Sequence, residues 1–500
     1  MTHASNHLLH HLSAAGDPAK VFATRPGQPD TTYRALFAGA ERIAAALAEA
    51  GLEPGDRVAA QVPKSLEAVQ LYLGCVLAGG VFLPLNTAYT GSEMAYFISD
   101  ATPRIIVCDP AREAEIAALA GEATLFTLGA DGSGTLMRAA KAHDSFAAVP
   151  RGPDDLAAIL YTSGTTGRSK GAMLSHANLA SNSETLRDVW RFTPDDVLIH
   201  ALPIFHTHGL FVATNVALLA GASVHFLPGF DAGAIVAAMP GATVLMGVPT
   251  FYTRLLDHPG LSRETVSDMR LFISGSAPLL VDTHEKWEAA TGHRILERYG
   301  MTETNMNTSN PYDGPRRAGT VGLPLPGVEL RILRDGKPAG PREIGMIEVR
   351  GPNVFKGYWQ MPEKTAEELR PDGWFITGDQ GFTDKDGYLT IVGREKDMII
   401  SGGFNVYPKE VESVIDAIAG VRESAVIGVP HPDFGEAVVA VVVPGAESLT
   451  EAEIAAELKY AIARFKQPKQ TLFLPELPRN TMGKVQKKAL RDRYAHLFSG

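Results

Sequence analysis

The sequence has only two cysteines in 500 residues, Cys75 and Cys108, and both lie in apolar runs. We therefore expect two buried thiols in a reducing compartment and no disulfide framework. Cysteine and histidine nowhere stand at metal-ligand spacing. Positive charge is also scarce, because 46 Lys and Arg face 56 Asp and Glu, for a net charge of −10. That balance argues against a nucleic-acid surface or a polybasic membrane anchor.

Long hydrophobic runs are missing as well. Residues 1–12 lack the basic region, apolar stretch and cleavage site of a secretory signal. The most apolar stretch, 209–230, is interrupted by Asn215, Gly221 and Pro228. This favours a buried helix followed by a strand over a membrane span. We expect a cytoplasmic protein, and a chain of this length predicts two or three domains.

Strand and helix patterns alternate along the first 300 residues. Residues 31–51 repeat apolar side chains at helical spacing, with Thr31 or Thr32 as a cap and Gly51 as the stop. Short apolar strands follow at 56–62 and 104–109. The alternation predicts an α/β fold with largely parallel, doubly wound sheets.

The secondary structure expected from the sequence changes twice in its last third. From about 320 the chain carries short strands and turns, which predict a β-rich subdomain. Past 394 a small α+β unit follows. We place the boundary at the charged turn GREKD, which gives a large N-terminal domain, 1–393, and a small C-terminal domain, 394–500.

The segment YTSGTTGRSKG (161–171) follows an apolar strand and is rich in Gly, Thr and Ser. Glycines let the backbone approach a polyanion, while hydroxyls, amides and Lys170 satisfy phosphate oxygens. It is not a Walker A loop, because that motif needs a Gly directly before its Lys, and here Ser169 precedes Lys170. Strands at 242–250 and 269–277 also run into small-residue loops. The three loops are expected to share one ligand site at the carboxyl ends of their strands.

Further motifs make the chain resemble the adenylate-forming superfamily, which includes acyl-CoA synthetases, luciferases and nonribosomal-peptide adenylation domains. The resemblance spans essentially the whole chain. It implies that ATP is consumed to AMP, with Mg²⁺ bound, and that an acyl-adenylate then reacts with CoA. Beyond 161–171, the motifs stand in the family's order: LPIFHTHG (202–209), SGSAPL (274–279), ERYGMTE (297–303), TGD (377–379), GREKD (393–397), SGGFNVYPKEVE (401–412) and PRNTMGK (478–484).

The resemblance also implies a role for each residue of these motifs. Thr302 would contact the α-phosphate, and Glu303, with Thr165, would hold Mg²⁺, since hard oxygen ligands suit that cation. Asp379 would accept from the ribose hydroxyls beside Arg394, and Tyr299 would stack on adenine. The remaining nucleotide contacts would come from the phosphate loop and from two further loops: Thr162, Ser163, Gly164, Thr165, Thr166, Gly167 and Lys170; Gly275, Ser276 and Ala277; Glu297, Arg298, Gly300 and Met301.

Lys484 is the candidate catalytic cation. When a carboxylate attacks the α-phosphorus and pyrophosphate leaves, an ammonium that bridges the charged oxygens lowers the barrier. The resemblance selects Lys484, whereas Lys487 and Lys488 are expected to be solvated charges. It further implies that the small domain rotates about a hinge at Lys396, withdrawing Lys484. That rotation would bring in the face that forms the CoA tunnel: Ser401, Gly402 and Gly403. Because acetylation would remove the charge of Lys484, a lysine acetyltransferase and deacetylase are candidate partners.

Two arginines, Arg254 and Arg298, fall in the expected acyl pocket. A guanidinium pairs bidentately with a carboxylate, so a second carboxylate on the substrate is one explanation. The other explanation is pairing within the protein, of Arg298 with Glu297 or Glu303 and of Arg254 with Asp257.

The motifs GVPTFYTRLL, LFISGSAPLL and ERYGMTETNMNTSNPYDG resemble malonyl-CoA synthetases. This implies that Arg254 and Arg298 bind the distal carboxylate of malonate. Hydrogen bonds would come from Ser274, Ser276 and His206, and His206 would orient the reacting carboxylate. With a near-neutral pKa, His206 could instead be only a structural hydrogen-bonding group. Met301 and Met306 would flank C2 of the diacid, which makes methylmalonate a second candidate substrate.

Three other functions stay open on the sequence. The first is a CoA ligase for another small acid, such as oxalate, acetate or an aryl carboxylate. The second is an amino-acid-activating adenylation domain, but such domains usually neighbour a carrier segment, and none follows Lys484. The third is a nucleotide-binding scaffold without activity, against which the intact set of catalytic motif residues argues: Thr302, Glu303, Asp379, Arg394 and Lys484.

Overall fold

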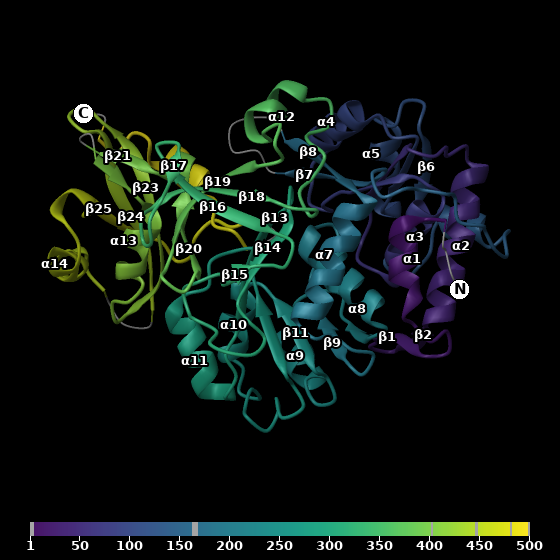
Figure 1. The fold of residues 1–500 in the computed structure, drawn as a ribbon, viewed down its shortest axis with the longest axis horizontal. Helices are drawn as coiled ribbons and strands as arrows, with labels where there is room; N and C mark the ends of the chain where they lie inside the picture. The colour runs from purple at the N-terminus through teal and green to yellow at the C-terminus, as the bar shows by residue number, and fades with distance from the viewer. Residues whose placement is uncertain (1–4, 163–168, 402–403, 446–448, 481–482, 499–500) are drawn as a thin grey trace.

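The computed structural model describes residues 5–162, 169–401, 404–445, 449–480 and 483–498. They form four β-sheets with helices packed against them. Figure 1 shows the N-terminal part of the chain on the right and the C-terminal unit, in yellow-green, on the left. No described helix is long and apolar enough to cross a membrane.

The six-stranded sheet has the strand order β6-β5-β3-β4-β7-β8. Every neighbouring pair is parallel except β7 and β8, which form an antiparallel hairpin. β3 and β5 confirm the two early strand predictions, and both cysteines are free and buried, as expected. The strands are β3 (Arg57–Gln61), β4 (Val81–Pro84), β5 (Ile105–Cys108), β6 (Thr124–Thr127), β7 (Leu156–Thr162) and β8 (Lys170–Ser175).

The nine-stranded sheet has the order β15-β14-β13-β12-β11-β9-β10-β1-β2. Its centre is parallel from β13 to β1, and β2, β14 and β15 add antiparallel edges. The loops after the parallel strands β11 and β12 therefore open at one edge of the sheet. The strands are β1 (Val21–Arg25), β2 (Gln28–Thr32), β9 (Val197–His200), β10 (Ser223–Phe226), β11 (Val244–Gly247), β12 (Leu271–Ser274), β13 (Leu296–Met301), β14 (Asn305–Ser309) and β15 (Leu323–Pro324).

Helices cover the faces of these two sheets. α2 (Tyr33–Glu49) begins after Thr32, whose hydroxyl accepts from the backbone N–H of Ala35, so the predicted helix and its Thr cap are confirmed. The stretch 209–230 forms a buried helix and then β10, also as predicted. Its first part is a π-helix, His208–Thr214, which continues into α8 (Asn215–Ala220). The other helices here are α1 (His7–Ala14), α3 (Leu66–Leu77), α4 (Gly91–Ala101), α5 (Glu113–Ala117), α6 (Thr135–Ala140), α7 (His176–Val189), α9 (Ala232–Ala238), α10 (Pro249–Leu256) and α11 (Val281–Thr291).

The last third of the chain forms two antiparallel sheets, apart from the parallel pairing of β25 with β24. The chain passes from the first to the second through a 3₁₀ turn, Glu395–Asp397. The domain limits at 393 and 394 remain a prediction. The elements are β16 (Glu329–Arg334), β17 (Lys337–Pro338), β18 (Gly345–Arg350), α12 (Pro362–Glu368), β19 (Phe375–Thr383) and β20 (Leu389–Arg394), then β21 (Ile399–Ser401), β22 (Phe404–Val406), α13 (Pro408–Ile415), β23 (Val421–His431), β24 (Gly435–Pro444), α14 (Glu451–Ala461), β25 (Gln470–Phe473) and α15 (Lys487–Tyr494).

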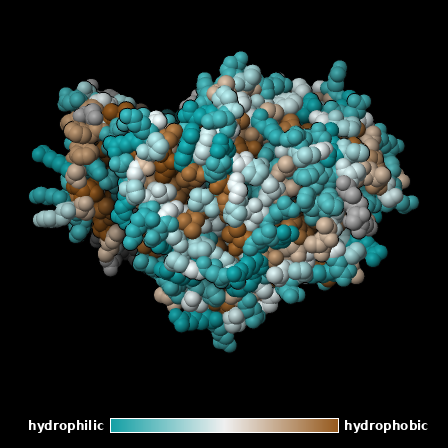
Figure 2. Space-filling view, in the orientation of Figure 1, coloured by the Kyte–Doolittle hydropathy of each residue, from teal (hydrophilic) through white to brown (hydrophobic). Residues whose placement is uncertain are grey.

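Among the described residues, five of the six large apolar side chains that are exposed lie in the C-terminal unit. Figure 2 shows hydrophobic surface on the left of the molecule, over this unit. Large apolar side chains that are exposed there include Ile400 and Phe404, with 51% and 56% of their surface accessible. Both lie on the β21–β22 hairpin, beside the predicted CoA-tunnel residues Gly402 and Gly403, which lie outside the described residues.

Candidate active site

The phosphate side of the site is built on the β7–β8 hairpin. Thr162 and Lys170 are cross-strand partners, where β7 ends and β8 begins. Lys170 donates to both carboxylate oxygens of Glu368, at 3.0 and 3.1 Å. The hairpin therefore brings two of the predicted phosphate ligands together. The others lie outside the described residues: Ser163, Gly164, Thr165, Thr166 and Gly167.

Thr302 and Glu303 lie in the tight turn between β13 and β14. Gly300 permits this turn, because a Cβ there would stand 1.9 Å from the carbonyl oxygen of Asn305. Glu303 is buried and accepts a hydrogen bond from the Tyr358 hydroxyl at 2.9 Å. The backbone thus fixes Glu303 next to the phosphate side of the site.

The predicted ribose ligand Asp379 lies opposite Arg394 in the β19–β20 register. Arg394 Nε lies 2.9 Å from Asp379 Oδ1, and the attraction of Asp379 raises the pKa of Arg394. Tyr299 also reaches this carboxylate, since its hydroxyl donates to Asp379 Oδ2. The structure therefore joins Tyr299, Asp379 and Arg394, and stacking of Tyr299 on adenine remains a prediction.

Arg298 is a buried guanidinium, with only 3% of its surface exposed. Among the described residues, its Nε and Nη2 atoms have no hydrogen-bond partner. Burial lowers the pKa of Arg298 to about 9. Neither carboxylate considered from the sequence pairs with it, because Glu297 faces His284 at 3.6 Å and Glu303 binds Tyr358. The alternative that Arg298 pairs with Glu297 or Glu303 is therefore wrong for the described residues.

Other unpaired polar atoms belong to residues near Arg298. Ser274 Oγ and His208 Nε2 are buried and lack partners within the described chain. The Ser276 hydroxyl lies 3.3 Å from His208 Nδ1, and Arg298 depresses the pKa of His208 after burial itself. His208, at the start of the π-helix, was not among the predicted site residues. In the sequence, His208 is marked only as the second His of HTHG, directly before an apolar run. The structure adds a further reason to place it at the site, since π-helical turns concentrate at functional sites.

The pKa of His206 lies far below the neutral range, so the near-neutral pKa considered from the sequence is wrong. Burial, then the charges of Lys484 and Arg298, lower the pKa of His206 to about 3. The imidazole is therefore neutral at physiological pH. It can orient a carboxylate through a hydrogen bond, but it brings no charge to the site.

Arg254 occupies a different setting from Arg298. It is exposed on α10, with its guanidinium 5.6 Å from the centroid of the Phe230 ring. Within the described chain it forms no ion pair with Asp257, so this alternative is wrong as well. Arg254 lines a cavity of about 250 Å³, and the other lining residues come from the middle and the end of the chain: Leu202, Pro203, Phe230, Val248, Thr250 and Phe251, with Arg479, Asn480 and Gly483.

Lys484 lies on a loop of the C-terminal unit that contacts the N-terminal part of the chain. Gly483 contacts Thr250 at the start of α10, where a Cβ on Gly483 would lie 3.3 Å from the hydroxyl. Lys484 keeps solvent contact, yet the surrounding protein, followed by repulsion from Arg394, lowers the pKa of Lys484 to about 8. Asp379 and Glu303 oppose that shift, so the ammonium lies among the predicted nucleotide ligands.

Three further predicted residues lie in the C-terminal unit. Lys396, the predicted hinge, is exposed in the 3₁₀ turn after β20, yet desolvation by the surrounding protein lowers its pKa to about 8. Ser401 is buried at the end of β21. Lys487 is not a solvated charge, because it forms an ion pair with the buried Glu412. Lys488 is exposed, as expected.

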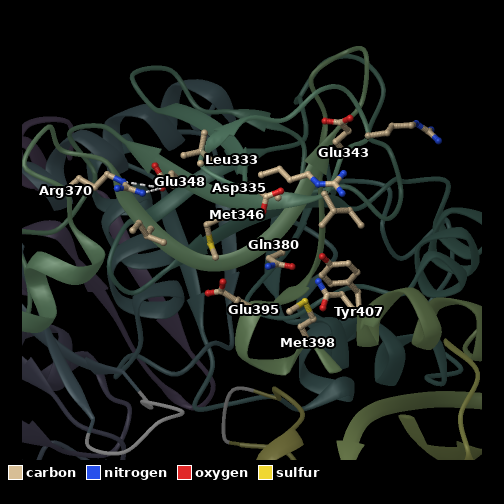
Figure 3. Close-up of a pocket in the computed structure, with 17 residues that line it drawn as sticks. Leu333, Asp335, Glu343, Met346, Glu348, Arg370, Gln380, Glu395, Met398 and Tyr407 are labelled. Carbon is tan, nitrogen blue, oxygen red and sulfur yellow. Dashed lines mark hydrogen bonds and ion pairs between the residues drawn. The ribbon is translucent and has the colours of Figure 1, made fainter. Parts of the chain in front are cut away.

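A second, larger cavity of about 920 Å³ lies between the β16–β20 sheet and the beginning of the C-terminal unit. Figure 3 shows Arg370 paired with Glu348 at one side, at 2.6 Å, and Met346, Gln380, Glu395 and Met398 around its middle. No predicted substrate or nucleotide ligand lines this cavity. It therefore belongs to the junction beside Lys396 and not to the nucleotide site.

Comparison with known proteins defines the class. Residues 11–359 match the AMP-binding enzyme family, and residues 410–484 match the AMP-binding enzyme C-terminal domain. The chain belongs to this family and is an AMP-forming acid–thiol ligase, an acyl-CoA synthetase that uses ATP and CoA. The predicted family and fold class are confirmed.

Individual relatives differ in the acid that they activate. A feruloyl-CoA synthase of Amycolatopsis sp is 37% identical over 483 residues, covering 94% of this chain and 96% of the relative. A malonate–CoA ligase of Arabidopsis thaliana is 36% identical over 474 residues, covering 87% and 78%. The ATP-bound crystal structure of MatB from Rhodopseudomonas palustris is 60% identical, covers 99% of both chains and superposes with a TM-score of 0.97. Apo MatB gives 0.85, so the arrangement here is the more similar to the ATP-bound form.

Proposed function

We propose that this acyl-CoA synthetase is a malonyl-CoA synthetase, converting ATP, malonate and CoA to malonyl-CoA, AMP and diphosphate. The observation that carries the proposal is the buried guanidinium of Arg298, which has no carboxylate partner among the described residues. A desolvated, unpaired cation is costly unless a ligand supplies the opposite charge. A diacid supplies it with its distal carboxylate, whereas acetate or a benzoate does not.

The surroundings of Arg298 support a small acid. Ser274 Oγ and His208 Nε2 remain available for carboxylate oxygens. His206 stays neutral, so it adds no competing charge. Met301 and the buried Met306 lie on the same β13–β14 hairpin as Arg298, and they would flank C2 of malonate. We extend the proposal to methylmalonate as a second substrate on this basis.

The chemistry follows from the charges around Lys484. One malonate carboxylate attacks the α-phosphorus, the bond to the bridging oxygen breaks and pyrophosphate leaves. Lys484 would stabilise the charge that builds on these oxygens. The thiolate of CoA then attacks the acyl carbon, and AMP leaves with the bonding electrons. Mg²⁺ would neutralise the triphosphate, and the buried carboxylate of Glu303 fits it, because Mg²⁺ bound with ATP takes one or two protein carboxylates.

An acid panel tests the proposal. AMP release is measured with ATP, CoA and each of malonate, methylmalonate, succinate, acetate and benzoate, and malonate is expected to give the highest kcat/KM. Removing one partner of a desolvated charge pair costs about 2–5 kcal/mol, so Arg298→Met should lower malonate kcat/KM by about 30-fold or more. Arg254 is exposed, and Arg254→Ala should cost about fivefold.

Arg263→Ala, which removes an exposed arginine elsewhere, is the matched control for Arg254→Ala. Near-parent malonate kinetics in Arg298→Met would overturn the second-carboxylate argument. A higher kcat/KM for acetate or benzoate in the parent would assign the chain to another acid instead. Diphosphate release with amino acids and no CoA would favour an amino-acid-activating enzyme.

A further inference from the structure

A continuous chain of contacts joins the two ends of the proposed Mg²⁺–ATP site. The Tyr358 hydroxyl lies 2.9 Å from Glu303 Oε1 and 2.6 Å from Glu368 Oε2. Glu368 in turn accepts from Lys170 through both of its oxygens. The Lys170 ammonium also lies 4.1 Å from the centroid of the Tyr358 ring, within cation–π range. Neither Tyr358 nor Glu368 belongs to a motif considered from the sequence.

The backbone fixes Tyr358 beneath Lys170. Residues 356–359 run antiparallel to β8, with Met173 N donating to Gly357 O at 3.0 Å and Trp359 N donating to Gly171 O at 2.7 Å. Tyr358 itself pairs with Ala172 in this bridge. α12 then begins at Pro362 and ends at Glu368. The lysine of the phosphate loop, its carboxylate partner and the phenol are therefore held by main-chain hydrogen bonds.

The Glu368 carboxylate is paired with cations before any nucleotide binds. Burial, then the charges of Glu303 and Glu368, raise the pKa of Tyr358, so the phenol keeps its single proton. Burial acts to raise the pKa of Glu368, but hydrogen bonds from Tyr358, Lys364 and Lys170 outweigh it and lower that pKa. Lys364 completes the set, 3.0 Å from Glu368 Oε1. Glu368 is thus a carboxylate in contact with two ammonium groups, and it shares the single Tyr358 proton with Glu303.

We propose that Tyr358 and Glu368 are positioning residues for the nucleotide, acting through Lys170 and Glu303. A lysine side chain loses rotamer freedom when it is fixed on a phosphate. Here Glu368 and the Tyr358 ring fix Lys170 in advance, and the same phenol orients the Glu303 carboxylate. Preorganised charges of this kind strengthen binding without reorganisation at the moment of reaction. The proposal concerns the ATP half of the reaction and does not depend on which acid the enzyme uses.

Tyr358→Phe tests the shared phenol directly. It removes one hydroxyl and keeps the ring under Lys170. Hydrogen bonds to charged groups are strong, so the Kd for ATP with Mg²⁺, measured by calorimetry on the full chain without acid or CoA, should rise about tenfold. A titration with Mg²⁺ at fixed ATP should show half-saturation moved to higher Mg²⁺. Thioester formation from supplied acyl-adenylate, which involves no triphosphate, should keep the parent rate.

Tyr388→Phe is the matched control. Tyr388 is also buried, also lies under a cation, with Arg317 4.0 Å from its ring centroid, and also donates its hydroxyl, to the Pro315 carbonyl at 2.9 Å. This control should leave ATP affinity within about twofold of the parent. Equal ATP affinity in Tyr358→Phe and Tyr388→Phe would overturn the role of Tyr358.

Glu368→Gln tests whether Glu368 positions Lys170 for ATP or competes with the phosphates of ATP for Lys170. The amide can still accept from Tyr358 but holds Lys170 without charge, so ATP affinity should fall several-fold. Tighter ATP binding in Glu368→Gln would overturn the proposal, because Glu368 would then compete with phosphate for Lys170. The double variant should lose less than the product of the two single effects, since both act on Lys170. None of these readouts uses malonate, so they fail or succeed independently of the proposed substrate.

Discussion

The guanidinium of Arg298 lies directly against the backbone of Gly275. A Cβ on Gly275 would stand 2.4 Å from Arg298 Cζ and 2.6 Å from its Nε and Nη1 atoms. Gly275 follows β12 and Arg298 lies in β13, and these strands are parallel neighbours. The absence of a side chain at Gly275 therefore creates the space that the buried cation fills.

Gly275→Ala should displace Arg298 and weaken acid binding. Overpacking of this kind typically costs about 1–3 kcal/mol, so the KM for malonate should rise about fivefold to a hundredfold. ATP binding measured by calorimetry should change far less, because the added methyl group points at Arg298. Gly229→Ala is the control, since a Cβ there meets nothing within 4 Å. A loss of ATP affinity that matches the loss of acid affinity would contradict this reasoning.

Adenylation should depend on the protonation of Lys484. Its pKa of about 8 means that the ammonium is present below pH 8 and is lost as the pH rises through that value. We expect kcat/KM for adenylation to fall about tenfold per pH unit above about pH 8, and this fall is the alkaline limb of the pH profile. Thioester formation from supplied acyl-adenylate should lack the limb.

Two variants assign the limb to its residue. Lys484→Ala should lower adenylation by about a hundredfold or more and spare the thioester step. Lys396 also has a pKa of about 8, so Lys396→Arg is the necessary comparison. If the limb persists in Lys484→Arg and disappears in Lys396→Arg, the hinge and not Lys484 carries the pH dependence.

Arg479 should position the Lys484 loop. Its guanidinium donates to the carbonyl of Gly483 and forms an ion pair with Glu423 on β23, while Asn480 Oδ1 accepts from Lys484 N at 2.9 Å. Because a misplacement of about 1 Å can cost a hundredfold, Arg479→Ala should slow adenylation by about tenfold to a hundredfold.

The measurement for Arg479→Ala is single-turnover adenylate formation, compared with thioester formation from supplied acyl-adenylate. Arg479→Lys should recover part of the rate, since it keeps the charge opposite Glu423. Lys487→Met, which breaks an ion pair in the same unit outside the 479–484 loop, should leave adenylation unchanged. Equal losses in both half-reactions of Arg479→Ala would point to a general loss of folding instead.

Local patterns in the sequence predicted most of the fold. The helix after Thr32 and the strands β3, β5, β7, β10, β11 and β12 follow from apolar spacing and capping, which act between near neighbours in the chain. α15 escaped prediction, because its segment KKALRDRY buries only Leu490 and shows no apolar stripe. The π-helix at His208 also escaped, since the periodicity of the segment does not separate it from an α-helix.

The candidate site was predictable only where motifs name its residues. Lys170, Glu303, Asp379, Arg394 and Lys484 stand in recognisable segments. Tyr358 and Glu368 join the site through contacts with residues 55 and 198 positions away, and no local pattern encodes such contacts. The states of His206 and Arg298 were equally unreadable, because burial and neighbouring charges set them after folding.

The unpaired cation at Arg298 also bears on how this enzyme can evolve. Replacing a buried charge by an apolar residue of similar volume often stabilises a protein, so selection for stability alone would remove Arg298. In the proposed function, Arg298 makes the empty enzyme less stable than its fold allows, in exchange for recognition of the second carboxylate. An enzyme that activates an aryl or fatty acid, whose single carboxylate is the reacting one, has no such reason to keep the arginine. A change of acid specificity and a gain in thermal stability can therefore arise from one substitution.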